Sequence, residues 1–156
     1  MDERLLNLRV NTKKTNKDSI KAVLDKFNIK YEESDISIDS LIVYDKVSDV
    51  VKSLFKQGYV SFQDATSSSL QDYIELNHGD KVLDLCAAPG GKSMHMAEKL
   101  EIGSITSCDI YEHKINLLKN EANRLGLDNI NFQINDAMKL NCLLYTSDAA
   151  DDVYQV

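Results

Sequence analysis

The chain has 156 residues, of which 43% are hydrophobic and 28% charged, and these values suit one ordinary domain with a small appendage and a buried core. It has no apolar run near the ~20 residues of a membrane span and no signal-peptide pattern. Its three cysteines lack CxxC spacing, so we expect a reducing cytoplasm and neither a disulfide framework nor a zinc site. The net charge of −7 argues against a nucleic-acid partner for the chain as a whole.

Residues 1–60 predict a small α+β appendage. Leu6, Leu8 and Val10 alternate with polar residues, as in a half-buried strand. Apolar residues at helical spacing then predict one helix that stops near Asn28 and a second, shorter helix that stops at Gly58. Between the two helices lie two stretches with strand-like apolar patterns, Ile36 with Ile38 and residues 41–43.

This first segment is also the least acidic part of the chain, and its basic residues gather in one stretch. The members of the cluster are Lys13, Lys14, Lys17 and Lys21. A cluster of this kind is compatible with an edge that faces RNA phosphates. Taken alone, a solvated helix face is the simpler interpretation.

Residues 61–141 predict a regular alternation of strands and helices. Asp64 can cap a helix that runs to about Leu76, and a turn follows at residues 77–80. Strands are then expected at 81–86, 104–108 and 130–134, and helices at 91–100 and 113–125, the second closed by Gly126. This order indicates parallel strands with right-handed crossovers, which is half of a doubly wound α/β sheet.

The last stretch, residues 142–156, fits no element that this architecture needs next. Its sequence CLLYTSDAADD at residues 142–152 resembles the translated reverse complement of a sequencing-library adapter. We therefore expect residues 142–156 to be a non-native tail.

The loop after the strand expected at 81–86 is the most informative segment. It ends in small residues and two glycines where a helix begins, so a ligand can approach the backbone and meet the helix amides. A nucleoside triphosphatase P-loop would need glycine at position 86, where the chain has Cys86. The G-x-G-x-x-G pattern of dinucleotide-binding folds is also not present.

The sequence LDLCAAPGGK at residues 83–92 resembles motif I of the Sun/NOL1/NOP2 family of RNA (cytosine-5) methyltransferases, closest to the bacterial enzymes that modify 16S ribosomal RNA. Two weaker stretches agree, LRVN at residues 8–11 and FQDA at residues 62–65, so the resemblance covers about residues 5–141. It implies a partial Rossmann-like methyltransferase sheet at 61–141, preceded by an RNA-recognition-like subdomain at 1–60. It also implies S-adenosyl-L-methionine as cofactor, RNA as partner and a monomeric full-length parent.

The resemblance carries the cofactor-binding role to nine residues: Cys86, Ala87, Ala88, Pro89, Gly90, Gly91, Lys92, Asp109 and Asp136. Lys92 opposes the dipole of its helix, which is tolerable where it meets an anion such as the cofactor carboxylate or an RNA phosphate. Asp109 ends a strand where a nucleotide-binding unit places a ribose-binding acid, although its spacing to Glu112 also fits a capping box. By resemblance Asp136 contacts the adenine, with a helix cap as the alternative.

Two further expectations concern the interior of the sheet and the catalytic groups. Asp84 lies inside an apolar strand, so its carboxylate must receive hydrogen bonds, most simply from amides of the following loop. The family's reaction uses cysteines that follow the fourth and fifth strands, and nothing in this chain matches their contexts. We therefore expect a cofactor-binding fragment with no catalytic residue, no metal site, no activity of its own and an unpaired strand edge at 81–86. A degenerate P-loop triphosphatase and a non-catalytic RNA-binding module are the alternatives.

Overall fold

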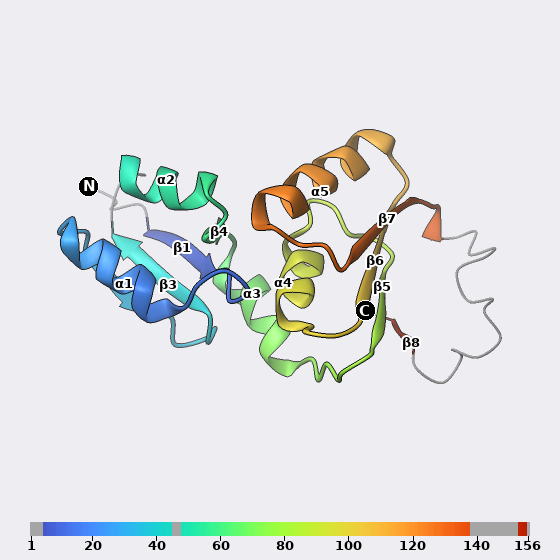
Figure 1. Cartoon of the computed structure of the whole chain (residues 1–156), viewed down its shortest axis with the longest axis horizontal. Helices are drawn as coiled ribbons and strands as arrows, with labels where there is room; N and C mark the ends of the chain where they lie inside the picture. Colours follow the sequence, from blue (N-terminus) through green and yellow to red (C-terminus); the bar gives the residue numbers. More distant parts are fainter. Residues whose placement is uncertain (1–4, 45–47, 138–152, 156) are drawn as a thin grey trace. The chain divides into compact units, whose positions relative to one another are not determined.

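The computed structural model describes residues 5–44, 48–137 and 153–155 (Figure 1). By their internal contacts the residues divide into two compact units. Unit 1 comprises Met1–Glu75 with Arg124–Gly126, and unit 2 comprises Leu76–Asn123 with Leu127–Val156. Within the described ranges no helix is long and apolar enough to cross a membrane.

Unit 1 is built on a four-stranded antiparallel sheet with the order β2-β3-β1-β4. Its strands are β1 (Leu5–Val10), β2 (Tyr31–Glu33), β3 (Ser40–Tyr44) and β4 (Val60–Phe62). Its helices are α1 (Lys17–Lys26), α2 (Asp49–Lys56), α3 (Ala65–Ser69) and the 3-10 turn η1 (Leu70–Tyr73). The structure thus confirms the α+β character that was expected of the first segment.

The core of unit 1 follows the apolar periodicity of its sequence. Leu8 and Val10 of β1 are fully buried, as their alternation predicts. The helices contribute buried residues at helical spacing: Ile20, Leu24, Val51 and Leu54. Both helices end where expected, because Asn28 adopts a φ of 55° and Gly58 a φ of 74°, which a continuing helix does not allow.

The prediction of a strand at Ile36 and Ile38 is wrong. Both side chains are exposed, at 55% and 67%, and they lie outside any strand. The strand in this part of the chain is instead β2 (Tyr31–Glu33), which pairs with β3 at the sheet edge. An edge strand with charged, exposed residues carries no alternating apolar signal, so its sequence did not reveal it.

Lysines of the cluster form ion pairs and hydrogen bonds within unit 1. Lys17 and Lys21 both form ion pairs with Glu33, and together they lower the pKa of that carboxyl to about 2. The ammonium of Lys14 donates to the backbone oxygens of Gln57 and Arg124 at 3.0 and 2.9 Å. Three of the four lysines in the cluster thus have partners within unit 1.

Unit 2 holds a parallel sheet with the order β7-β6-β5-β8. Its strands are β5 (Lys81–Asp84), β6 (Ser104–Asp109), β7 (Ile130–Ile134) and β8 (Val153–Gln155). Helix α4 (Gly91–Lys99) connects β5 to β6, and α5 (Glu112–Leu125) connects β6 to β7. The expected α/β class and the parallel order of the first three strands are confirmed.

Two expectations about this sheet need correction. The edge of β5 is not unpaired, because β8 runs parallel to it from Lys81 opposite Val153 to Leu83 opposite Gln155. Strand β5 also ends at Asp84, two residues earlier than expected, because the Asp84 side chain accepts from the amide of Cys86 and turns the chain. Apart from Val153–Gln155, the expected non-native tail falls on residues 142–152 and 156, which lie outside the described ranges.

Candidate functional site

The loop at residues 85–90 joins β5 to α4 and is tied to two strands. The amide of Cys86 donates to Oδ1 of Asp84 at 3.2 Å, and the amide of Ala87 donates to the backbone oxygen of Cys108 at 2.9 Å. Cys86 and Pro89 are exposed, Ala88 is half-buried, and the Ala88–Pro89 peptide is cis. The loop therefore presents backbone and small side chains from a position that both strands hold.

Glycine is required at the end of this loop. Gly90 precedes α4 with a φ of 109°, a conformation that residues with a side chain rarely adopt. A Cβ atom at Gly90 would lie 2.7 Å from Cδ2 of Leu118 in α5. Gly91 and the exposed Lys92 follow as the first two residues of α4, so the free amides of a helix start and a cation occur together.

Asp84 has the hydrogen-bond donors that its burial requires. The residue is only 8% exposed, and its second oxygen, Oδ2, accepts from Oγ of Ser93 at 2.6 Å. Ser93 in turn accepts from Oγ of Ser107 in β6 at 2.9 Å. One of the two donors is thus the expected loop amide, at Cys86, whereas the other is a hydroxyl of α4 that sequence reasoning did not identify.

Asp109 is the last residue of β6. One of its carboxylate oxygens accepts a hydrogen bond, and the other has no partner among the described residues. Its Oδ1 accepts from the amide of Tyr111 at 3.3 Å and lies 3.7 Å from Nζ of Lys114. Its Oδ2 is buried and has no hydrogen-bond partner among the described residues. The capping-box alternative is wrong, because α5 begins only at Glu112 and Asp109 lies outside its first turn.

A buried carboxylate oxygen without a donor is costly unless a ligand or water supplies one. Asp109 is 4% exposed, so its Oδ2 is a strong acceptor in a site of low polarity. Two hydroxyls on adjacent carbons, as in a ribose, are suitable donors for such an oxygen.

Asp136 follows β7 and is half-buried. It lies two residues beyond Ile134, which is the partner of Asp109 in the β6–β7 pairing, and the amide of Asn135 donates to the backbone oxygen of Asp109. The loop after β5, Asp109 after β6 and Asp136 after β7 therefore meet at the carboxyl edge of one parallel sheet. This is the edge at which open α/β sheets bind ligands.

Exposed apolar side chains accompany these polar groups. Ile110, Tyr111 and Ile134 are 52%, 53% and 58% exposed, although each lies close in sequence to a buried or half-buried acidic position. Sequence reasoning passed over them because an isolated exposed hydrophobic residue has no periodic signal. At this edge they offer an apolar surface that suits a flat heterocycle.

The two described cysteines have different environments. Cys108 is fully buried in β6, and burial, with a further contribution from the negative charge of Asp84, raises the pKa of its thiol. Cys86 is exposed in the loop. Cys142 lies outside the described residues. Within those residues no three His, Cys, Asp or Glu side chains form a group that could hold a metal ion.

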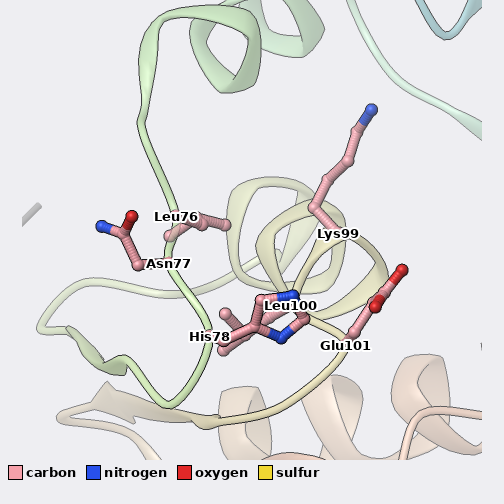
Figure 2. Close-up of a pocket in the computed structure, with 6 residues that line it drawn as sticks. All are labelled: Leu76, Asn77, His78, Lys99, Leu100 and Glu101. Atoms are coloured by element: carbon pink, nitrogen blue, oxygen red, sulfur yellow. The ribbon is translucent and has the colours of Figure 1, made fainter.

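A separate cavity of about 210 Å³ lies near the C-terminal end of α4, whereas the loop at residues 85–90 precedes its N-terminal end (Figure 2). Its lining residues are Leu76, Asn77, His78, Lys99, Leu100 and Glu101. Figure 2 shows the Lys99 side chain extending away from His78, so the polar groups do not converge on one point. None of the nine residues expected to bind a cofactor lines this cavity.

Comparison with known proteins identifies related sequences. A family described as 16S rRNA methyltransferase RsmB/F matches residues 72–152. A probable ribosomal RNA small subunit methyltransferase B from Bacillus subtilis is 37% identical over 133 residues, which cover 85% of this chain and 30% of that protein. The chain therefore spans about a third of the length of this relative.

Solved structures superpose on this chain and share its fold. The crystal structure of PH0851 superposes with a TM-score of 0.81 at 27% identity, covering 89% of this chain and 31% of that one. A methyltransferase homolog from Pyrococcus horikoshii superposes with a TM-score of 0.79 at 23% identity, covering 86% of this chain and 45% of the other. The second similarity concerns the fold alone.

Proposed function

This chain belongs to the RsmB/F family of 16S rRNA methyltransferases, and from that membership we propose that its unit 2 binds S-adenosyl-L-methionine. The observation that carries the proposal is the buried Oδ2 of Asp109, which has no hydrogen-bond partner in the described part of the chain and lies at the same sheet edge as a glycine loop and a helix start. An acceptor for ribose hydroxyls and a set of free amides for an anion are the two features that this cofactor requires.

We assign the nine residues to different parts of the cofactor. The backbone from Cys86 to Gly91 and the ammonium of Lys92 bind the methionine carboxylate, because a helix start favours an anion and Lys92 adds a positive charge. Asp109 accepts from the ribose hydroxyls, and Asp136 accepts from the adenine amino group. When bound, the cofactor supplies an electrophilic methyl group.

The parent protein, we propose, is a cytoplasmic RNA (cytosine-5) methyltransferase that acts on 16S ribosomal RNA. The support is the match of residues 72–152 to the 16S rRNA methyltransferase RsmB/F family, the similarity to the probable methyltransferase B of Bacillus subtilis, and the resemblance of residues 83–92 to motif I. In this proposal residues 1–60 form the RNA-recognition-like subdomain and residues 61–141 the cofactor-binding half of the methyltransferase domain.

The chain itself should bind cofactor without transferring the methyl group. Methylation at C5 requires a thiolate that adds to C6 of cytosine, and then a base that removes the C5 proton. Cys108 is unsuited to this role because it is fully buried and its pKa is raised. Cys86 is exposed, but we assign it to the loop that binds the cofactor.

The proposal is tested by incubating the purified chain with radiolabelled S-adenosylmethionine and 16S ribosomal RNA. Ultraviolet cross-linking should label the protein, whereas the RNA should gain no 5-methylcytosine above background. Cofactor-independent RNA binding without protein labelling would support the RNA-binding module instead. Methylated RNA would place a nucleophile among the cysteines of this chain, and loss of the methylation in Cys86→Ser would identify Cys86 as that nucleophile.

A further inference from the structure

Three buried side chains form a continuous hydrogen-bonded chain beneath the loop at residues 85–90. Ser107 of β6 donates to Ser93 of α4, and Ser93 donates to Asp84 of β5, at 2.9 and 2.6 Å. Both serines are fully buried, so water does not compete for these bonds. The chain connects the two central strands with the first turn of the helix that follows the loop.

The direction of the bonds is determined by the acid at one end. Asp84 can only accept as a carboxylate, so the Ser93 hydroxyl must point its proton toward Oδ2 and is then left as an acceptor for Ser107. With Oδ2 engaged in this way, Oδ1 remains directed at the amide of Cys86. Hydrogen bonds to a carboxylate are shorter and stronger than neutral ones, which suits the 2.6 Å distance.

We propose that Ser93 and Ser107 are positioning residues that orient the Asp84 carboxylate, and through it the backbone at Cys86, for cofactor binding. The inference rests on the proposed function of this loop and adds two residues to it. Neither serine reaches the exposed face of the loop, because each is fully buried. Their effect on affinity therefore comes from holding the loop amides in place before the cofactor arrives.

A pair of isosteric variants separates the hydroxyl from the shape of the side chain. Ser93→Thr and Ser93→Val add a similar volume to the buried site, but only Thr retains the donor to Asp84. We expect calorimetry to show cofactor affinity within about threefold of wild type for Thr and a loss of at least about tenfold for Val. Ser107→Ala should weaken binding, and the double variant Ser93→Ala/Ser107→Ala should be no more than about twofold worse than Ser93→Ala, since Ser107 acts through Ser93.

Ser68→Ala is the matched control. Ser68 is also fully buried, lies in unit 1, and its hydroxyl has no partner among the described residues. Its removal should leave cofactor affinity unchanged. Equal losses for Ser68→Ala and Ser93→Ala would show that the effect is general destabilisation and would overturn the proposal.

Hydrogen exchange of the Cys86 amide in the cofactor-free chain gives a second readout. Exchange should be at least about tenfold faster in Ser93→Val than in Ser93→Thr, because the Asp84 acceptor loses its orientation. Equal exchange in Thr and Val would overturn the positioning role whatever the affinities are. A wild-type chain that binds no cofactor would overturn the proposed function, and the exchange rates would still decide the role of the serines.

Discussion

Nζ of Lys114 lies 3.7 Å from Oδ1 of Asp109, whereas Oδ2 of the same carboxylate has no partner among the described residues. The cation helps to keep a charged group stable in a position that is 4% exposed, and it leaves Oδ2 available to a ligand. Lys114 comes from the first turn of α5, five residues after Asp109, where sequence reasoning sought only a capping partner.

The first prediction follows from this arrangement. Asp109→Ala should weaken S-adenosylmethionine binding by roughly 1.5–3 kcal/mol, the range for a hydrogen bond that involves a charged group, and Asp109→Asn should retain part of the affinity. Titration calorimetry measures both. Glu101→Ala is the control, because it removes one exposed carboxylate from the same unit at the separate cavity. Equal affinities of the Asp109 and Glu101 variants would remove Asp109 from the site.

The second prediction compares two glycines with positive φ in unit 2. Gly79 has a φ of 89°, and a Cβ atom added there would meet nothing within 4 Å, whereas a Cβ at Gly90 would lie 2.7 Å from the buried Leu118. Gly79→Ala should cost only the conformational penalty of about 1–2 kcal/mol. Gly90→Ala should cost at least about 1 kcal/mol more, since Leu118 must move within a packed core. Urea denaturation measures the difference, and equal costs would show that Leu118 yields freely.

The third prediction concerns thiol reactivity. Alkylation at pH 8, followed by peptide mass spectrometry, should label Cys86 and spare Cys108, because Cys108 is fully buried and its pKa is raised. Urea should expose Cys108 to labelling. S-adenosylmethionine should slow the alkylation of Cys86, while ATP with magnesium should not. Labelling of Cys108 in the folded chain at the rate of Cys86 would contradict the described burial.

Sequence periodicity predicted most of the fold because the buried positions recur at regular intervals. Leu8 with Val10 and Met94 with Ala97 are all fully buried, as their spacing requires. The strand Tyr31–Glu33 was missed because an edge strand buries too little to leave a pattern. Ser93 and Ser107 were missed because serine is common at helix starts and in strands. Only the structure shows that their hydroxyls form a hydrogen-bonded chain that ends at Asp84.

The pairing of β8 with β5 leads to a fourth prediction. Strand β8 has three residues, Val153–Gln155, so it contributes few hydrogen bonds to the sheet. Because we expect residues 142–156 to be a non-native tail, their deletion should change the free energy of unfolding by no more than about 0.5 kcal/mol. A clear fall in melting temperature after the deletion would show that β8 is an integral part of unit 2.

The central claim is that unit 2 binds S-adenosylmethionine at the carboxyl edge of its sheet, and calorimetric titration of the complete chain tests it most directly. We expect saturable binding of one S-adenosylmethionine per chain, weakened in Asp109→Ala, with no heat from ATP and magnesium. Position 86 supports this selectivity, because Cys86 occupies the place where a triphosphate loop needs glycine. Binding of ATP with magnesium, and none of S-adenosylmethionine, would contradict the claim.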